Sequence, residues 1–247
     1  GQGHTGVPRD EAATSLAHLT GADEAAFAAA LDALDGLKSV VVTDDVLYPQ
    51  PLAGQEARIA ERVRALVAEG PPWPPVDAAA RLDKAETALG VALSASQREA
   101  ARKLLGMRFA VLTGGPGTGK TTLVRTLLEA VPLAADKVAL AAPTGRAAKR
   151  LAESTERDAK TLHRMLEAEP GRRFRRGPGR PVEAELIVVD EASMIDVTLM
   201  DALLAALDED AGLWLVGDVD QLPSVGPGRV LGDLIDSGAV PVVRLEE

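Results

Sequence analysis

One glycine-rich stretch constrains this chain more than any other feature, and it reads LTGGPGTGKTT over residues 112–122. From Gly114 to Thr121 it matches the pattern G-x-x-x-x-G-K-[S/T], in which backbone N–H groups cradle phosphates. Residues 108–113 are predicted as an apolar strand and residues 121–130 as a helix, so the glycines lie on a strand-to-helix turn. This context predicts an α/β protein that binds phosphate at a helix N-terminus.

Each part of this turn has a predicted role in holding a nucleotide. Gly114, Gly117 and Gly119 are expected to take positive φ and to leave the loop N–H groups open to phosphate. Lys120 is placed to neutralise the β- and γ-phosphates, and the Thr121 hydroxyl to coordinate Mg²⁺, which implies ATP with Mg²⁺ as the ligand. The predicted contacts are Gly114, Gly115, Pro116, Gly117, Thr118, Gly119, Lys120, Thr121 and Thr122. A purely structural glycine turn is disfavoured because the pattern is long and its flanks fit.

Composition limits the other classes of function. The chain has 247 residues, 46% of them hydrophobic, and no cysteine, so it can bury a core but cannot form disulfides, thiolate metal sites or a cysteine nucleophile. It has no apolar run of about eighteen residues and no signal-peptide pattern, so no membrane span is predicted and a cytoplasmic location is expected. The net charge of -10 disfavours a protein that coats nucleic acid by bulk charge.

Positive charge is nevertheless concentrated in one part of the chain. Residues 141–181 contain eleven Lys or Arg and five Asp or Glu, a net charge of +6. Such a tract in an acidic chain indicates a restricted groove for a polyanion, although a solvated face would have the same composition. A Gly- and Pro-rich stretch within it, predicted to be a mobile loop, contains Arg172, Arg173, Arg175, Arg176 and Arg180.

Residues 1–70 are predicted to form a separate, mainly helical module. The elements expected are helices at residues 10–19, 23–34 and about 55–68, and strands at residues 39–43 and 46–48. Helices with a small β-wing suggest a winged-helix-like module, but no basic cluster marks the second helix, so packing is as consistent as DNA binding. Residues 70–75, GPPWPP, are predicted to be a stiff spacer. The predicted divisions are therefore residues 1–70, a linker and connecting helix at 71–92, and an ATPase domain at 93–247.

Three further apolar strands are predicted, and each one ends in polar residues. They cover residues 138–142, 186–189 and 213–216. Because ligands bind at the carboxyl ends of the strands in α/β sheets, the segments that follow are candidates for one common site. These segments read APTGRAAKRL at 142–151, DEAS at 190–193 and GDVDQLP at 217–223.

The adjacent pair Asp190 and Glu191 is predicted to be catalytic. The first carboxylate is placed on the Mg²⁺ side of the nucleotide, as a metal ligand, and the second is placed to orient water at the γ-phosphate. A helix N-cap, supplied by Ser193 or Asp196, would explain one acidic residue but not the pair. Gln221 follows the next strand and is placed to hydrogen-bond the γ-phosphate.

Gln97 admits two interpretations, which depend on where its helix begins. If Ser94 is the N-cap, Gln97 completes a capping box and its role is structural. If Ser96 is the N-cap, Glu99 completes the box, and the free Gln97 amide matches the paired donor and acceptor of an adenine edge. The spacing is compatible with both.

Taken in order, these stretches resemble the superfamily 1 DNA helicases, and most closely the RecD-like branch of exonuclease V alpha-subunit type and its stand-alone relatives. GGPGTGKTT resembles motif I, APTGRAAKRL motif Ia, TLHRML the short DNA-contacting motif after it, IVVDEAS motif II, and LVGDVDQLPSVGPGRVLGDL motif III. The resemblance covers about residues 93–247. It implies a RecA-like P-loop domain with a mostly parallel sheet, belonging to an ATP-dependent 5′-to-3′ DNA helicase of recombination or repair.

The resemblance also implies roles for residues that the patterns leave open. It makes Gln97 an adenine contact and Gln221 the sensor that couples phosphate state to DNA. His163 alone is more typical of a packed or capping residue than of a catalyst, but the resemblance places it beside single-stranded DNA. The implied DNA contacts are Pro143, Thr144, Gly145, Arg146, Thr161 and His163.

The partners implied are single-stranded DNA, a second RecA-like domain that supplies an arginine to the γ-phosphate, and possible nuclease or helicase subunits. The motifs stop at residue 247, before that second domain, so the chain is expected to be a fragment that binds Mg²⁺-ATP but hydrolyses it only in traces. One rival interpretation is a nucleotide-dependent DNA-binding or switch module without unwinding activity. Another is a small-molecule kinase, for which no acceptor pocket or lid is visible in the sequence.

Overall fold

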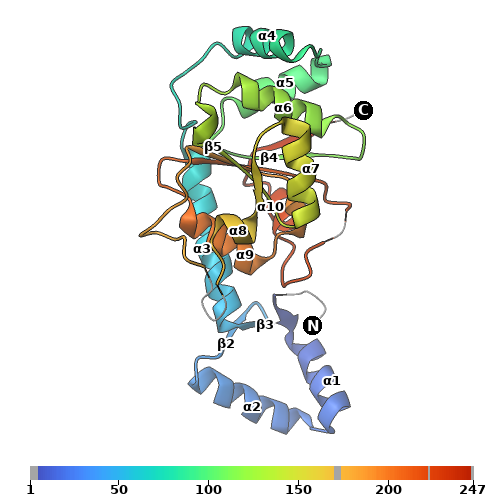
Figure 1. Cartoon of the computed structure of the whole chain (residues 1–247). Coiled ribbons are helices and arrows are strands. Elements are labelled where there is room, and N and C mark those ends of the chain that lie inside the picture. Colours follow the sequence, from blue (N-terminus) through green and yellow to red (C-terminus); the bar gives the residue numbers. More distant parts are fainter. Residues whose placement is uncertain (1–4, 170–173, 222, 246–247) are drawn as a thin grey trace.

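The computed structural model describes residues 5–169, 174–221 and 223–245. Its centre is a six-stranded sheet in the order β6-β5-β7-β8-β4-β9, and all of its strand pairs are parallel (Figure 1). The strands are β4 (Phe109–Gly114), β5 (Val138–Ala142), β6 (Ala159–Thr161), β7 (Leu186–Val189), β8 (Gly212–Gly217) and β9 (Val242–Leu245). The predicted α/β class and parallel sheet are confirmed, and β6 and β9 are strands that the sequence patterns did not predict.

Helices cover both faces of this sheet (Figure 1). On one face lie α5 (Ala95–Leu104), α6 (Lys120–Ala130) and α7 (Gly145–Thr155), with α4 (Ala78–Leu89) packed on α6. On the other face lie α3 (Gln50–Ala68), α8 (Leu162–Met165), α9 (Val197–Ala206) and α10 (Val230–Asp236). Short 3₁₀ turns, η1 (Ala135–Lys137) and η2 (Ala192–Met194), connect elements.

The central strands are apolar throughout because they are buried on both faces. In β4, Phe109 and Val111 belong to the core beneath α3 and α9, whereas Ala110 and Leu112 belong to the core beneath α5 and α6. Strands β7 and β8 alternate between the two cores in the same way. A continuous apolar run, rather than polar alternation, is therefore the signature of these strands.

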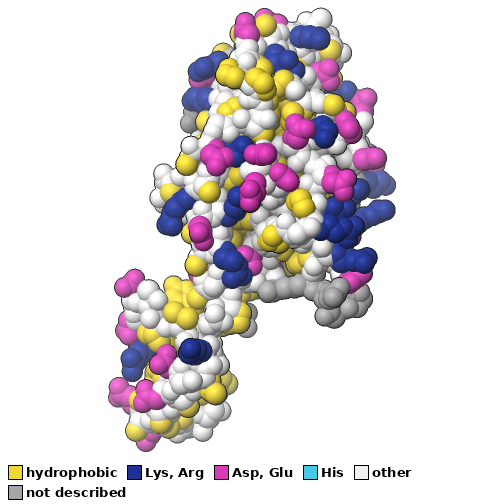
Figure 2. Space-filling view, turned by 90° about the vertical axis from the view of Figure 1, so that its left-hand side faces the viewer, with side chains coloured by type: hydrophobic (Ala, Val, Ile, Leu, Met, Phe, Trp, Pro, Cys, Tyr) yellow, Lys and Arg dark blue, Asp and Glu magenta, His cyan; other side chains and the backbone are white. Residues whose placement is uncertain are grey.

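The amino-terminal module is a separate lobe joined to the rest by a narrow neck (Figures 1 and 2). It contains the predicted helices and hairpin, as α1 (Arg9–Thr20), α2 (Glu24–Gly36), β2 (Val40–Thr43) and β3 (Val46–Pro49), and a short strand β1 (Val7–Pro8). The strands form an antiparallel sheet in the order β1-β3-β2. Phe27 is the one buried side chain in α1 and α2, so the lobe has little core of its own.

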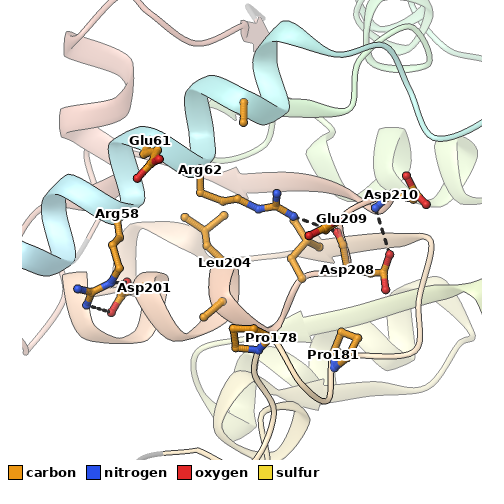
Figure 3. A pocket seen from close by; sticks show the side chains of 13 residues that line it. Arg58, Glu61, Arg62, Pro178, Pro181, Asp201, Leu204, Asp208, Glu209 and Asp210 are labelled. Carbon is orange, nitrogen blue, oxygen red and sulfur yellow. Dashed lines mark hydrogen bonds and ion pairs between the residues drawn. The ribbon is translucent and has the colours of Figure 1, made fainter.

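Helix α3 packs with the sheet domain, although its sequence neighbours belong to the module. Its buried side chains Ile59, Val63 and Leu66 lie in the same core as β4 and α9. Arg58 donates from Nε and Nη2 to the Asp201 carboxylate at 3.0 and 2.7 Å, beside a groove of about 690 Å³ between α3 and α9 (Figure 3). The division near residue 70 stays a prediction, and these contacts favour grouping α3 with the sheet.

The proline-rich spacer is seated on the sheet domain. The Trp73 indole is buried, donates from Nε1 to the Leu105 carbonyl at 3.0 Å, and meets Trp214 edge-to-face at a centroid distance of 5.8 Å. The prolines around it keep the segment extended. The spacer therefore anchors the chain where it enters the sheet domain.

The arginine-rich stretch forms ion pairs where the structure describes it, and its mobility stays a prediction. Arg176 and Arg180 both bind the Glu167 carboxylate, with nitrogen–oxygen distances of 2.8 Å. Two hydrogen-bonded guanidinium groups on one carboxylate join the stretch to Glu167 by charge-assisted bonds. Arg172 and Arg173 lie outside the described residues.

Arg81 on α4 is expected to be a stability anchor for the P-loop helix. Its guanidinium donates to the carbonyls of Ala130 and Val131, at the C-terminus of α6, where unpaired carbonyls and the helix dipole favour a cation. Arg81→Ala is therefore expected to lower the free energy of unfolding by about 1.5–3 kcal/mol, measured by urea denaturation. Lys84→Ala on the exposed side of α4 is the matched control, and an equal loss in both variants would contradict this role.

Candidate nucleotide and nucleic-acid site

The predicted site segments meet at one edge of the sheet. In the parallel registers, Thr113 of β4 lies opposite Gly217 of β8, and Ala142 of β5 lies opposite Thr161 of β6. Val189 of β7 lies opposite Ala141 of β5. The carboxyl ends of β4, β5, β6, β7 and β8 therefore bring the glycine-rich loop, the acidic pair and the starts of α7 and α8 to the same side of the molecule.

The glycine-rich loop has the expected left-handed backbone at two of its three predicted positions. Gly117 and Gly119 have φ of 83° and 81°. Gly114 does not have positive φ, which corrects that part of the prediction. Glycine is needed there for another reason: a Cβ on Gly114 would lie 2.8 Å from the Leu245 carbonyl oxygen of the adjacent strand β9.

The Lys120 side chain lies across this loop. Its Nζ donates to the carbonyls of Gly114 and Gly115 at 2.5 and 2.8 Å. Its charge also acts on Asp190 and Glu191, because it opposes the rise that burial causes in the pKa of both carboxyls. The ammonium is therefore hydrogen-bonded to the loop while its charge acts on both carboxyls. Phosphate charge would be neutralised at this position.

Asp190 and Glu191 face this cation from the end of β7. Burial raises the pKa of the Asp190 carboxyl, and the Glu191 backbone N–H, which donates to Asp190 Oδ1 at 2.9 Å, acts against the rise. Burial and then the Asp190 charge raise the pKa of Glu191. Glu191 also has a φ of 53°, a left-handed conformation that costs a non-glycine residue about 1–3 kcal/mol and occurs often at functional sites.

The N-cap interpretation of the acidic residues is resolved by Asp196. Its Oδ1 accepts the Leu199 backbone N–H at 2.7 Å and caps α9. The Asp190 and Glu191 side chains are therefore not used as the cap of this helix, and the pair is left for a ligand. The Ser193 hydroxyl, the other candidate cap, is buried and has no hydrogen-bond partner among the described residues.

The donors fit a Mg²⁺ ion that is shared with phosphate. Thr121 lies in the first turn of α6, and Asp190 directly follows β7 at the same edge of the sheet. No group of three or more His, Cys, Asp or Glu that could hold a metal occurs in the described part of the chain. Mg²⁺ is usually bound by one or two carboxylates together with substrate phosphates and water, so a small protein donor set is what this ion requires.

Gln221 is held next to a buried carboxylate that the sequence patterns did not single out. Asp218, at the end of β8, is 3% exposed and accepts the Asp220 N–H and the Gln221 Nε2 at 3.1 and 3.2 Å. The charge of Asp218 also acts on Glu191. A Gly-Asp pair at the end of an apolar strand was the available signal for this residue.

The predicted DNA contacts lie at the starts of α7 and α8. Thr144 and Thr161 use their hydroxyls as N-caps, accepting the N–H groups of Ala147 and Arg164 at 3.2 Å. Both helices therefore begin at the shared sheet edge, with the side chains of Arg146 and His163 exposed. The His163 ring lies 5.9 Å from the ring of Phe174, centroid to centroid.

A profile of the AAA domain family matches residues 97–227, a span that holds the loop, the acidic pair and Gln221. The chain belongs to this family. The RecBCD enzyme subunit RecD of Mycobacterium tuberculosis is 47% identical over 167 residues, which cover 58% of this chain and 29% of that protein. The ATP-dependent RecD2 DNA helicase of Deinococcus radiodurans is 35% identical over 259 residues, covering 99% of this chain and 35% of the relative.

These relatives confirm the resemblance to the RecD-like helicases, and the second match includes the amino-terminal lobe because it spans nearly the whole chain. The chain spans about a third of the length of each of the two. Among solved structures, that of Pif1 helicase from Candida albicans is 22% identical, covers 64% of this chain and 40% of its own, and has a TM-score of 0.46. Membership in this P-loop family implies the use of a nucleotide.

Gln97 has the first of the two roles that the sequence left open, and it also makes a loop contact that neither interpretation included. Ser94 is the N-cap of α5, and the Gln97 Oε1 accepts the Ser94 N–H at 3.0 Å, which completes the capping box. The Nε2 of the same amide donates to the Thr118 carbonyl of the AAA-domain phosphate loop at 3.1 Å. Gln97 therefore ties the start of α5 to the loop, and its contact with adenine stays a prediction.

Replacing Gln97 separates these roles. Gln97→Ala removes the box and the bond to Thr118, so the free energy of unfolding is expected to fall by about 1 kcal/mol. If the amide also contacts adenine, the affinity for ATP should fall several-fold more than the affinity for GTP, whose base presents a different edge. Titration of both nucleotides checks this, and equal losses for ATP and GTP would leave Gln97 with the structural role alone.

The positive charge of the tract at 141–181 is partly neutralised by ion pairs. Among the described residues, Lys149, Arg157, Arg175, Arg176 and Arg180 are paired with glutamates. Four described cations of the tract form no ion pair with a described residue: Arg146, Arg150, Lys160 and Arg164. The charge of Arg150 acts on Glu191 and opposes the rise that burial causes in its pKa, so Arg146, Lys160 and Arg164 are the described cations of the tract that are available for a nucleic-acid backbone. Over the part of the chain that the structure describes, no helix is long and apolar enough to cross a bilayer.

Proposed function

We propose that this chain is the first motor domain of an ATP-dependent DNA helicase that moves 5′-to-3′ along single-stranded DNA in recombination or repair. One observation carries the proposal: Lys120 and the pair Asp190 and Glu191 lie at the sheet edge where α7 and α8 begin. Nucleotide chemistry and nucleic-acid contacts therefore share one edge, which is what coupling between them requires. The similarity to the ATP-dependent RecD2 DNA helicase of Deinococcus radiodurans supports the proposal.

The proposed nucleotide site uses the loop from Gly114 to Thr122 for the phosphates, with Gln97 at the base. Lys120 neutralises charge that grows on the γ-phosphate, and Glu191 orients and deprotonates the attacking water. Thr121 and Asp190 would hold Mg²⁺, which when bound supplies further positive charge to the phosphates. Gln221 senses the γ-phosphate.

The proposed DNA path runs over the starts of α7 and α8. Exposed Gly145 and Arg146 lie in the helix that follows β5 and exposed His163 lies in the helix that follows β6, and these two strands are paired. Their neighbours Pro143, Thr144 and Thr161 shape the two helix starts. Backbone N–H groups there and the unpaired cations favour contact with phosphates, which gives affinity without sequence specificity.

The proposed partners are single-stranded DNA and a second RecA-like domain that brings an arginine to the γ-phosphate. Such an arginine is typically worth about 10³ to 10⁵ in rate, so residues 1–247 alone should bind Mg²⁺-ATP but turn it over only in traces. Residues 93–247 would form the motor, and the amino-terminal lobe an accessory module. Nuclease or helicase subunits are further proposed partners, by comparison with RecD, and a cytoplasmic location is proposed with them.

The deciding experiment measures ATP hydrolysis with and without single-stranded DNA, and strand displacement, in the protein with both motor domains. DNA-stimulated turnover and unwinding are expected. Arg146→Ala should raise the DNA concentration for half-maximal stimulation several-fold and leave turnover without DNA unchanged, with Lys84→Ala as the matched control. Nucleotide-dependent DNA binding without strand displacement would instead support a switch module, and turnover that ignores DNA would contradict both.

A further inference from the structure

The end of β8, where the segment that carries Gln221 begins, packs closely against the backbone that follows Asp190 and Glu191. A Cβ on Gly217 would lie 3.2 Å from the backbone nitrogens of both Ala192 and Ser193, tighter than ordinary contact. Those nitrogens belong to the 3₁₀ turn η2 that begins directly after the acidic pair. The absence of a side chain at Gly217 therefore allows the strand that leads to Gln221 to touch the acidic segment.

A second contact of this kind lies farther along the same segment. A Cβ on Gly226 would overlap the Asp196 carboxylate and lie 2.7 Å from its Cγ, and one on Gly228 would overlap the Val197 side chain. The Val197 N–H also donates to the Pro227 carbonyl at 3.0 Å. Residues 226–228 are therefore seated on the first residues of α9.

Asp196 cannot move aside freely at this contact. Its Oδ1 accepts the Leu199 N–H and caps α9. This hydrogen bond fixes the orientation of the whole carboxylate. Ser224 stiffens the facing segment, since its Oγ donates toward the carbonyls of Gly226 and Gly228 at 3.0 and 2.8 Å. The Asp196 carboxylate and the turn at residues 224–228 are therefore both held in place by hydrogen bonds where they pack against each other.

We propose that Asp196 is a positioning residue, which seats the segment carrying Gln221 against the segment carrying Asp190 and Glu191. The contact at Gly217 holds one end of the Gln221 segment and the contact at Gly226 holds the other. A shift of Gln221 on nucleotide turnover is then passed to α9 through Asp196. The inference rests on the proposed function, because it concerns turnover at that same site.

The test uses a pair of substitutions that create and relieve one overlap. Gly226→Ala places a methyl group on the Asp196 carboxylate and should displace the segment. Asp196→Ser keeps a side-chain cap for α9 but is shorter, so the double variant Asp196→Ser/Gly226→Ala regains room for the methyl group. Gly36→Ala in the lobe, where a Cβ has no neighbour within 4 Å, is the matched glycine control.

Gly226→Ala is expected to lower kcat for DNA-stimulated ATP hydrolysis about 10- to 100-fold, as small misplacements of catalytic groups do. KM for ATP should stay within about twofold, because the phosphate loop is untouched. Hydrogen exchange at the Val197 amide should speed up about tenfold or more as its bond to Pro227 is lost. The double variant should return to the kcat of Asp196→Ser alone and regain slow exchange at the Val197 amide, because the overlap is relieved.

Two results would overturn the inference. In the first, Gly226→Ala has the same kcat and the same Val197 amide exchange rate as the unsubstituted protein. In the second, the double variant has the same kcat and exchange rate as Gly226→Ala. If Gly226→Ala does not fold, Asp196→Ser alone must still lower kcat several-fold at unchanged KM, and an unchanged kcat overturns the inference. A failure of the proposed function is distinguishable, because it appears as absent turnover in the unsubstituted protein. In that case the exchange at Val197 in the single and double variants still decides whether Asp196 seats the segment.

Discussion

Replacing Lys120 with alanine is expected to lower DNA-stimulated ATP hydrolysis by at least about 10²–10³-fold, which is the usual loss for a group that stabilises transition-state charge. Lys120 is the cation that the structure places between the glycine-rich loop and the pair Asp190 and Glu191. Without it, the γ-phosphate loses this ammonium, and the two carboxylates lose their shared counter-charge. Steady-state hydrolysis by the protein with both motor domains is the measurement.

The fold should survive this substitution. Lys120 is only half-buried, and its two hydrogen bonds go to loop carbonyls that water can reach. Urea unfolding should therefore change little. Lys137→Ala is the matched control because Lys137 precedes β5, at the opposite edge of the sheet, and forms a surface ion pair with Glu185 at 3.5 Å. A Lys120→Ala variant with turnover near that of Lys137→Ala would contradict the assigned role.

The second large effect expected is a separation of the two acidic residues. Glu191→Gln should retain Mg²⁺-ATP and slow hydrolysis about 10²–10⁴-fold, because it removes the group placed to act on water. Asp190→Asn should weaken Mg²⁺-nucleotide binding, because it removes the carboxylate placed to hold the metal. Both substitutions preserve shape, and an asparagine oxygen can still accept the Glu191 N–H, so the comparison isolates charge.

Nucleotide affinity from equilibrium titration and single-turnover hydrolysis are measured for both variants. A rise in Kd confined to Asp190→Asn and a loss of rate confined mainly to Glu191→Gln would support the two roles. Asp196→Asn is a useful third variant: asparagine caps a helix about as well as aspartate does, so an acidic residue that only caps α9 should leave nucleotide affinity unchanged. If Asp190→Asn and Glu191→Gln have the same affinities and the same rates, the division of labour is wrong.

The strands and helices that carry the motifs could be predicted from local sequence. Strands β5 and β7 occupy the residues predicted for them, and the loop from Gly114 to Thr121 joins a strand to a helix as its pattern requires. An apolar run, a helix-start signal and a glycine-rich turn each depend on nearest neighbours along the chain. Such features can be recognised before the tertiary structure is known.

Other features depended on neighbours that are distant in sequence. Nothing local indicates that Gly114 meets β9, or that α3 packs with the sheet. Gln97 completes a capping box and also binds the Thr118 carbonyl, a contact with a residue 21 positions away that its spacing did not indicate.

The sequence by itself determined that this chain contains a phosphate-binding turn and an acidic pair on an α/β sheet, because those signals are local and chemically constrained. Only the tertiary structure decided how closely the supporting segments approach one another. Asp196 and Gly226 are thirty positions apart, and their contact arises because β8 returns the chain beside β7. Steric complementarity of this kind depends on the whole packed arrangement, and no period or motif along the chain encodes it.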